Sequence, residues 1–135
     1  MARLRNARTV DDFFVSGVLQ ETALGVVTAP GWARHLVAAR RTMAARMRVA
    51  IDALDRYESL ELVTRPTDGF LLWTRVRGID DATFVERARD RGVALTAGSA
   101  WFCAEPDAAY VRWSVASATI EQITEAFRRL EGITG

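Results

Sequence analysis

The residue with the clearest capacity for chemistry is Arg112, which lies within the mostly apolar stretch of residues 109–115. Alternation along this stretch predicts a strand whose two faces carry Tyr110, Arg112 and Ser114 against Val111, Trp113 and Val115. A guanidinium in such a strand needs an anion or a hydrogen-bonded partner, because an unpaired charge in apolar surroundings is costly. We therefore expect Arg112 to be held by a carboxylate.

The source of that carboxylate stays open on the residues alone. Arg112 could pair within the fold, with Glu105, Asp107 or an acidic residue on a neighbouring strand. It could also anchor a ligand, because the planar fork of N–H groups binds a carboxylate through two parallel hydrogen bonds. The first interpretation makes Arg112 structural, and the second makes it the centre of a binding site for a small acid.

Other residues of the reactive types have simpler structural interpretations. The single histidine, His35, has no partner ligands for a metal site and is expected on the surface. Cys103 follows two aromatic residues and has no nearby histidine, which favours a buried or loop-packed thiol. The acidic pairs at residues 11–12 and 80–81 precede predicted helices, where they are typical of caps.

The composition excludes several kinds of chemistry. All 18 basic residues are arginine, so no side-chain amine is present to form a Schiff base. One cysteine excludes an internal disulfide and a cysteine-based zinc site, and it makes a reducing, cytoplasmic location the default expectation. Acidic and basic residues are interspersed to a net charge of +1, which gives no nucleic-acid stripe. No apolar run approaches the roughly 20 residues of a membrane span.

The elements that must position Arg112 can be predicted from periodicity and turn residues. Helices are expected at about residues 13–29, 32–57, 81–91 and 119–132. Strands are expected at about residues 60–64 and 70–76, with two more between residues 92 and 117. This order predicts an α+β fold, a small sheet of three or four strands with helices packed on it and a long N-terminal spine helix.

Three segments of the chain resemble segments of a known protein family. They are residues 63–73 (Val-Thr-Arg-Pro-Thr-Asp-Gly-Phe-Leu-Leu-Trp), 91–102 (Arg-Gly-Val-Ala-Leu-Thr-Ala-Gly-Ser-Ala-Trp-Phe) and 110–116 (Tyr-Val-Arg-Trp-Ser-Val-Ala). In this order they resemble the C-terminal part of fold-type I, pyridoxal-phosphate-dependent aminotransferases of class I/II. Residues 11–24 and 30–36 are especially similar to the aminotransferase-like domain of MocR-type regulators, which fuse it to a GntR winged helix.

The resemblance implies roles for particular residues. Arg112 matches the arginine that binds the α-carboxylate of the amino-acid substrate or effector. Gly98 and Ser99 match the loop beside the active site, and Phe70 matches the strand that leads toward the substrate. The segment around Ser16 and Gln20 is similar to a region near the dimer interface and the cofactor.

This chain also departs from the pattern of the family. Members are much longer, and the lysine and the other groups that hold pyridoxal phosphate lie upstream of the matching region. Residues 68–69 are Asp-Gly where Gly-Gly is usual, and the winged helix is absent. The resemblance therefore implies that residues 1–30 are the tail of the large domain with a connector helix. Residues 31–135 would then be the small domain of the aminotransferase fold.

Three functions are compatible with these observations. The chain could be the C-terminal domain of a regulator or aminotransferase, binding a carboxylate but not catalytic alone. It could instead be one subunit of a working aminotransferase completed by a separate large domain, or a stand-alone sensor of small acids. In the first two cases a large domain or a homodimer partner is missing, so Phe13, Phe14, Trp101 and Phe102 are expected to be partly exposed.

Overall fold

The structure, a computed structural model, describes Arg3 and residues 15–135 of the chain. The chain separates into two compact units, Met1–Ala39 and Arg40–Gly135. The long helix α3 (Trp32–Leu54) begins in the first unit and ends in the second. The domain boundary predicted after residue 30 stays a prediction.

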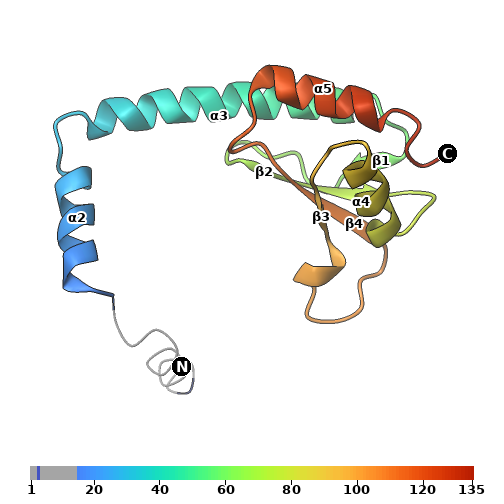
Figure 1. Ribbon diagram of the computed structural model, residues 1–135, viewed down its shortest axis with the longest axis horizontal. Coiled ribbons are helices and arrows are strands. Elements are labelled where there is room, and N and C mark those ends of the chain that lie inside the picture. The colour runs from blue at the N-terminus through green and yellow to red at the C-terminus, as the bar shows by residue number, and fades with distance from the viewer. Residues whose placement is uncertain (1–2, 4–14) are drawn as a thin grey trace. The chain divides into compact units, whose positions relative to one another are not determined.

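The first unit contains α2 (Gly17–Val27) and the start of α3 (Figure 1). Helix α2 follows Ser16 and ends at Thr28, whose backbone N–H donates to the carbonyl of Leu24. Its sequence is apolar on most sides, yet none of its side chains is buried. The helix predicted at residues 13–29 is confirmed from Gly17 to Val27, and Phe13 and Phe14 lie outside the described residues.

The second unit is built on a four-stranded antiparallel sheet in the order β1-β2-β4-β3. Its strands are β1 (Leu60–Leu62), β2 (Leu71–Val76), β3 (Thr96–Ala97) and β4 (Ala109–Ser114). The predicted sheet of three or four strands is confirmed. Strand β1 is shorter than the predicted residues 60–64.

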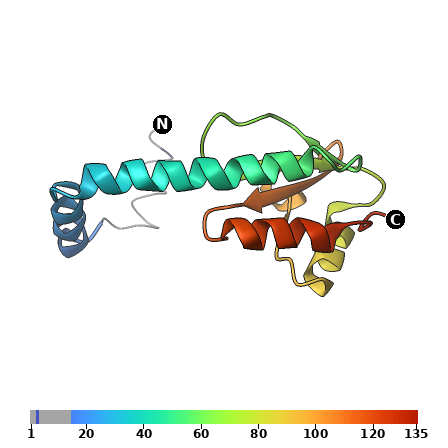
Figure 2. The same ribbon diagram turned by 90° about the horizontal axis from the view of Figure 1, so that it is seen from above.

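The helices of the second unit begin where the sequence predicts. Helix α4 (Asp81–Asp90) is capped by Asp80, whose carboxylate accepts from the Thr83 backbone N–H and whose pKa is lowered by the hydrogen bonds from Thr83. Helix α5 (Ile120–Leu130) starts with a capping box formed by Thr119 and Gln122. The end of α3 and α5 lie side by side over one face of the sheet (Figures 1 and 2). Within the described residues, no helix combines the length and apolar composition of a bilayer span.

The core lies between this helix-covered face and the helices. Trp113 of β4 stacks on Phe127 of α5 at 5.2 Å between ring centroids, and its edge meets Phe84 of α4. The Trp113 indole N–H donates to the hydroxyl of Thr74 at 2.8 Å, and Thr74 is fully buried. The hydroxyl of Thr74 in turn donates to the carbonyl of Val111. A buried donor at the centre of the sheet is thereby satisfied.

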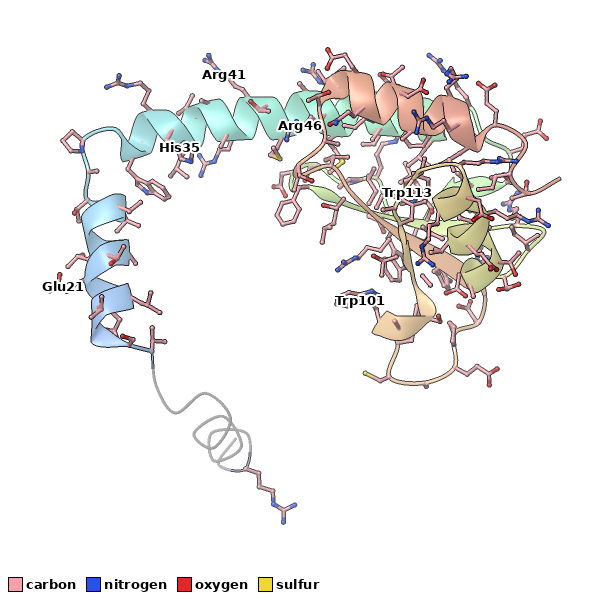
Figure 3. All side chains as sticks on the ribbon, in the orientation of Figure 1. Glu21, His35, Arg41, Arg46, Trp101 and Trp113 are labelled. Atoms are coloured by element: carbon pink, nitrogen blue, oxygen red, sulfur yellow. The ribbon has the colours of Figure 1, made fainter. Side chains whose placement is uncertain are left out.

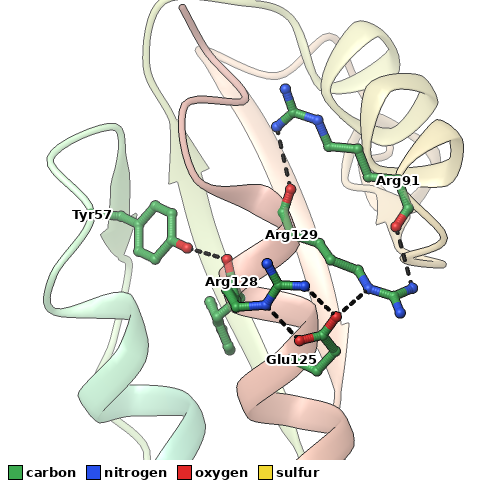
Figure 4. Close-up of polar contacts among 6 residues, drawn as sticks. Tyr57, Arg91, Glu125, Arg128 and Arg129 are labelled. Atoms are coloured by element: carbon green, nitrogen blue, oxygen red, sulfur yellow. Dashed lines mark hydrogen bonds and ion pairs between the residues drawn. The ribbon is translucent and has the colours of Figure 1, made fainter.

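The end of α5 carries an arginine-rich polar cluster (Figure 4). The Glu125 carboxylate accepts from Arg128 and Arg129 at 2.7–2.8 Å, and these hydrogen bonds lower its pKa to about 2. Arg129 also donates to the backbone carbonyl of Arg91, and Arg91 donates back to the carbonyl of Arg129. The cluster joins the ends of α4 and α5 on the surface of the second unit.

Replacement of Thr74 by valine removes the only acceptor of the Trp113 N–H among the described residues. We expect Thr74→Val to lower the free energy of unfolding by about 1–3 kcal/mol, the cost of an unsatisfied buried donor. The measurement is urea unfolding followed by far-ultraviolet circular dichroism. In the double variant with Trp113→Phe the donor is gone, so the two losses should not add. Strictly additive losses would contradict this account.

The Glu125 cluster should make stability depend on pH at the acid end. A carboxyl group with a lowered pKa stabilises the fold above its unfolded pKa, here about 4.5, and loses that contribution as the pH falls toward its folded pKa. We expect the stability difference between wild type and Glu125→Gln to shrink between about pH 4.5 and pH 2. The control is Glu86→Gln, because Glu86 is exposed and makes no ion pair among the described residues. An identical pH profile for both variants would refute the expectation.

Candidate ligand-binding site

Arg112 lies in the middle of β4, which is hydrogen-bonded to other strands along both edges. It is opposite Trp73 of β2 and Thr96 of β3 in the two registers. Its neighbours along the strand, Val111 and Trp113, are buried in the core, so the Arg112 side chain leaves the sheet on the other face. Arg112 itself is half-buried. Both strand pairings therefore fix the backbone from which the guanidinium projects.

The guanidinium of Arg112 stacks on an aromatic side chain. Its Cζ atom lies 4.0 Å from the centroid of the Trp101 ring. Trp101 belongs to η1, the 3₁₀ turn Ser99–Trp101, and its side chain remains 56% exposed. Figure 3 shows Trp101 on the side of the sheet opposite Trp113, which lies toward α3 and α5. The site is thus on the face of the sheet away from the core.

The internal ion pairs considered for Arg112 are not formed among the described residues. The Asp107 carboxylate accepts from Arg75 at 3.0 Å and from the Tyr110 hydroxyl at 2.9 Å. Glu105 is exposed, and no hydrogen bond or ion pair joins Arg112 to any residue that the structure describes. The guanidinium N–H groups of Arg112 therefore have no hydrogen-bond acceptor among the described residues.

Gly98 and Ser99 hold η1 against the sheet. The Gly98 N–H donates to the carbonyl of Tyr110 at 2.7 Å, and a Cβ atom on Gly98 would lie 2.5 Å from the Cβ of Tyr110. Only glycine permits this approach. The backbone N–H of Ser99 donates to the Asp81 carboxylate at 2.7 Å. The structure thus brings Gly98 to Tyr110, two residues before Arg112 on β4, and joins Ser99 to the start of α4.

An aromatic cluster lies on this sheet face beside Arg112. Trp73 stacks on Tyr110 at 6.0 Å, and Phe102 contacts both rings at 5.9 and 5.2 Å. Strand alternation predicts Tyr110 on the face of Arg112, but it does not identify Trp73 as a neighbour. The signal that would have found it is the pairing of the two internal strands, which sets Trp73 opposite Arg112.

The other predicted site residues, Phe70, Ser16 and Gln20, lie outside β4 and η1. Phe70 precedes β2 and is 49% exposed, and its carbonyl accepts from the backbone N–H of Val115 just beyond β4. Ser16 and Gln20 lie at the start of α2 in the first unit, where the Gln20 amide donates to the carbonyl of Val15. Their roles in binding a substrate or cofactor stay predictions.

The structure also tests which side chains were expected to be exposed. The exposure predicted for Trp101 and Phe102 is confirmed, and His35 is exposed as predicted, stacked on Trp32. The buried alternative for Cys103 is wrong, because the loop after η1 turns its thiol to solvent. Among the described residues, no group of three or more His, Cys, Asp and Glu side chains could hold a metal ion.

Substitution of Gly98 tests whether η1 depends on close contact with Tyr110. We expect Gly98→Ala to destabilise the second unit by about 1–3 kcal/mol, as overpacking does, because the new methyl group has no space. The control is Gly25→Ala in α2, where nothing lies within 4 Å and alanine favours the helix. Amide hydrogen exchange at residues 98–101 measures the local effect. Unchanged protection in Gly98→Ala would show that the contact is not required.

Comparisons with known proteins identify a family model and solved structures that match this chain. Residues 4–130 match the family model described as aminotransferase class I and II. The α-aminoadipate aminotransferase of Thermus thermophilus, solved with N-(5'-phosphopyridoxyl)-L-leucine, superposes with a TM-score of 0.81 at 24% identity. The kynurenine aminotransferase of Pyrococcus horikoshii gives 0.80 at 23%, and the aspartate aminotransferase of Thermotoga maritima gives 0.70 at 28%. No curated protein matches the chain.

These matches cover nearly all of this chain but a minor part of each structure. The shares of this chain are 96%, 98% and 93%, and the shares of the three solved chains are 33%, 33% and 30%. The α+β unit described above corresponds to a fragment of the aminotransferase fold. The match to the family model extends over well more than half of the residues. The chain belongs to the class I and II aminotransferase family.

Proposed function

We propose that this chain binds an amino acid through its carboxylate, with Arg112 as the binding residue. It would act as the C-terminal aminotransferase-like domain of a MocR/GntR-type regulator or of an aminotransferase, and would not be catalytic alone. Gly98, Ser99 and Phe70 would border the ligand.

One observation carries this proposal. Arg112 is half-buried, its guanidinium lies over the Trp101 ring, and it makes no ion pair with the residues that the structure describes. Partial burial strengthens a charge–charge interaction, because the effective dielectric constant is lower than in water. A carboxylate would find a fork of donors whose competing acceptor, Asp107, is already bound by Arg75 and Tyr110.

Pyridoxal phosphate is the cofactor of the family, but the residues of this chain do not make a site for its covalent attachment. None of the 135 residues is a lysine, so no side-chain amine is present. Ser16 and Gln20 remain the proposed neighbours of the cofactor, and the Ser16 side chain makes no capping hydrogen bond in the structure. We therefore assign no reaction step to this chain.

The aminotransferase alternative is favoured by the comparisons. The solved structures that match are titled as aminotransferases, and this chain spans about a third of their length. In that reading a large domain on another polypeptide supplies the lysine, and the exposed apolar helix α2 is covered by that domain or by a second copy of this chain.

The DNA upstream of Met1 distinguishes the three proposed functions. An in-frame winged helix would support the regulator, and a neighbouring gene for the large domain would support the split enzyme. A stand-alone sensor would have neither.

The proposal is tested by titration of the purified chain with L-leucine, followed through the arginine Nε–Hε resonances in nuclear magnetic resonance spectra. We expect saturable shifts centred on Arg112, with a dissociation constant in the millimolar range, as about 4 kcal/mol of binding free energy implies. L-Leucinamide, which lacks the carboxylate, should bind at least about tenfold more weakly because it loses a charge-assisted pair.

Two variants complete this test. Arg112→Gln should abolish the saturable shifts of the remaining residues. Arg77→Gln is the matched control, because it removes an exposed arginine directly after β2 that is paired with Glu61. Binding of L-leucine that survives in Arg112→Gln would refute the proposed function.

A further inference from the structure

We infer that Trp101 is a positioning residue for Arg112, because it holds the guanidinium in the orientation that binds a carboxylate. The inference rests on the proposed function, because it concerns the same site. Trp101 is not among the site residues predicted from the sequence.

The geometry of the contact favours this role. A guanidinium is planar, and its five N–H donors point outward in that plane. The Cζ atom lies over the Trp101 ring, 4.0 Å from its centroid. A guanidinium that packs its face on an aromatic ring keeps its in-plane donors free. A carboxylate approaching the edge of Arg112 would then meet a fork that is already oriented.

Trp101 is itself held in place from both sides. On its N-terminal side, its backbone N–H donates to the carbonyl of Gly98 at 2.9 Å, and Gly98 is fixed to Tyr110 of β4. On its C-terminal side, the ring of Phe102 packs on Trp73 and Tyr110. The backbone that carries the indole is therefore attached to the same two strands that carry Arg112 and its cross-strand neighbour.

No ion pair with a described residue draws Arg112 away from Trp101. An arginine side chain has about 2 kcal/mol of rotamer entropy, so an unrestrained guanidinium would lose freedom on binding. One acidic side chain considered for pairing, Asp107, already accepts from Arg75 and from the Tyr110 hydroxyl. Arg112 therefore has the Trp101 ring as its contact and no described carboxylate as a competitor.

The test compares Trp101→Phe, which keeps an aromatic face, with Trp101→Leu, which keeps apolar bulk without a π-system. We expect Trp101→Phe to bind L-leucine within about twofold of wild type. We expect Trp101→Leu to bind roughly three- to tenfold more weakly, as loss of a cation–π contact and of preorganisation implies. Trp32→Leu is the control, because Trp32 stacks on His35 and not on Arg112. Wild-type affinity in Trp101→Leu would overturn the inference.

A second measurement needs no ligand and separates this inference from the proposed function. The ¹⁵N order parameter of the Arg112 Nε–Hε bond should be high in wild type and in Trp101→Phe, and should fall in Trp101→Leu. If wild type fails to bind L-leucine, the proposed function fails even where these order parameters behave as expected. If wild type binds but the order parameter and the affinity are unchanged in Trp101→Leu, the positioning role alone is refuted.

Discussion

The site depends on the position of β4 between β2 and β3, hydrogen-bonded along both edges. This constraint fixes which residues of β4 face the core and which face the opposite side. Val111 and Trp113 enter the core, where the indole N–H of Trp113 is satisfied by Thr74. Arg112 is then forced onto the other face, because side chains alternate along a strand. The same hydrogen bonds that stabilise the sheet thus present the guanidinium.

What surrounds Arg112 explains why it can serve a ligand instead of the fold. Asp107 lies close in sequence, but its carboxylate is occupied by Arg75 and Tyr110. The contact that Arg112 does make, with Trp101, covers a face of the guanidinium and leaves its donors free. The ligand that we propose for this arrangement is the carboxylate of an amino acid. The matched structures also show that such a unit forms about a third of a longer protein.

The sequence was sufficient for most of the fold. The stripe of α3, the Asp80 cap and the Thr119–Gln122 capping box are local patterns, and each is confirmed. The site was only partly predictable. Arg112 could be identified from strand alternation, but the roles of Trp73 and Trp101 depend on strand pairing and on a 3₁₀ turn set by long-range contacts. The thiol of Cys103 was expected to be buried or packed in its loop, because local composition does not report which way a loop turns.

The central claim is that Arg112 receives a carboxylate. The most direct measurement is a crystal structure of the chain soaked with L-leucine. The account predicts the ligand carboxylate in the plane of the Arg112 guanidinium, with two N–H···O distances of about 2.7–2.9 Å, and the Trp101 ring still stacked on the guanidinium face. A structure in which the carboxylate binds elsewhere, or in which Arg112 leaves Trp101 to pair with a carboxylate of its own chain, would contradict the account.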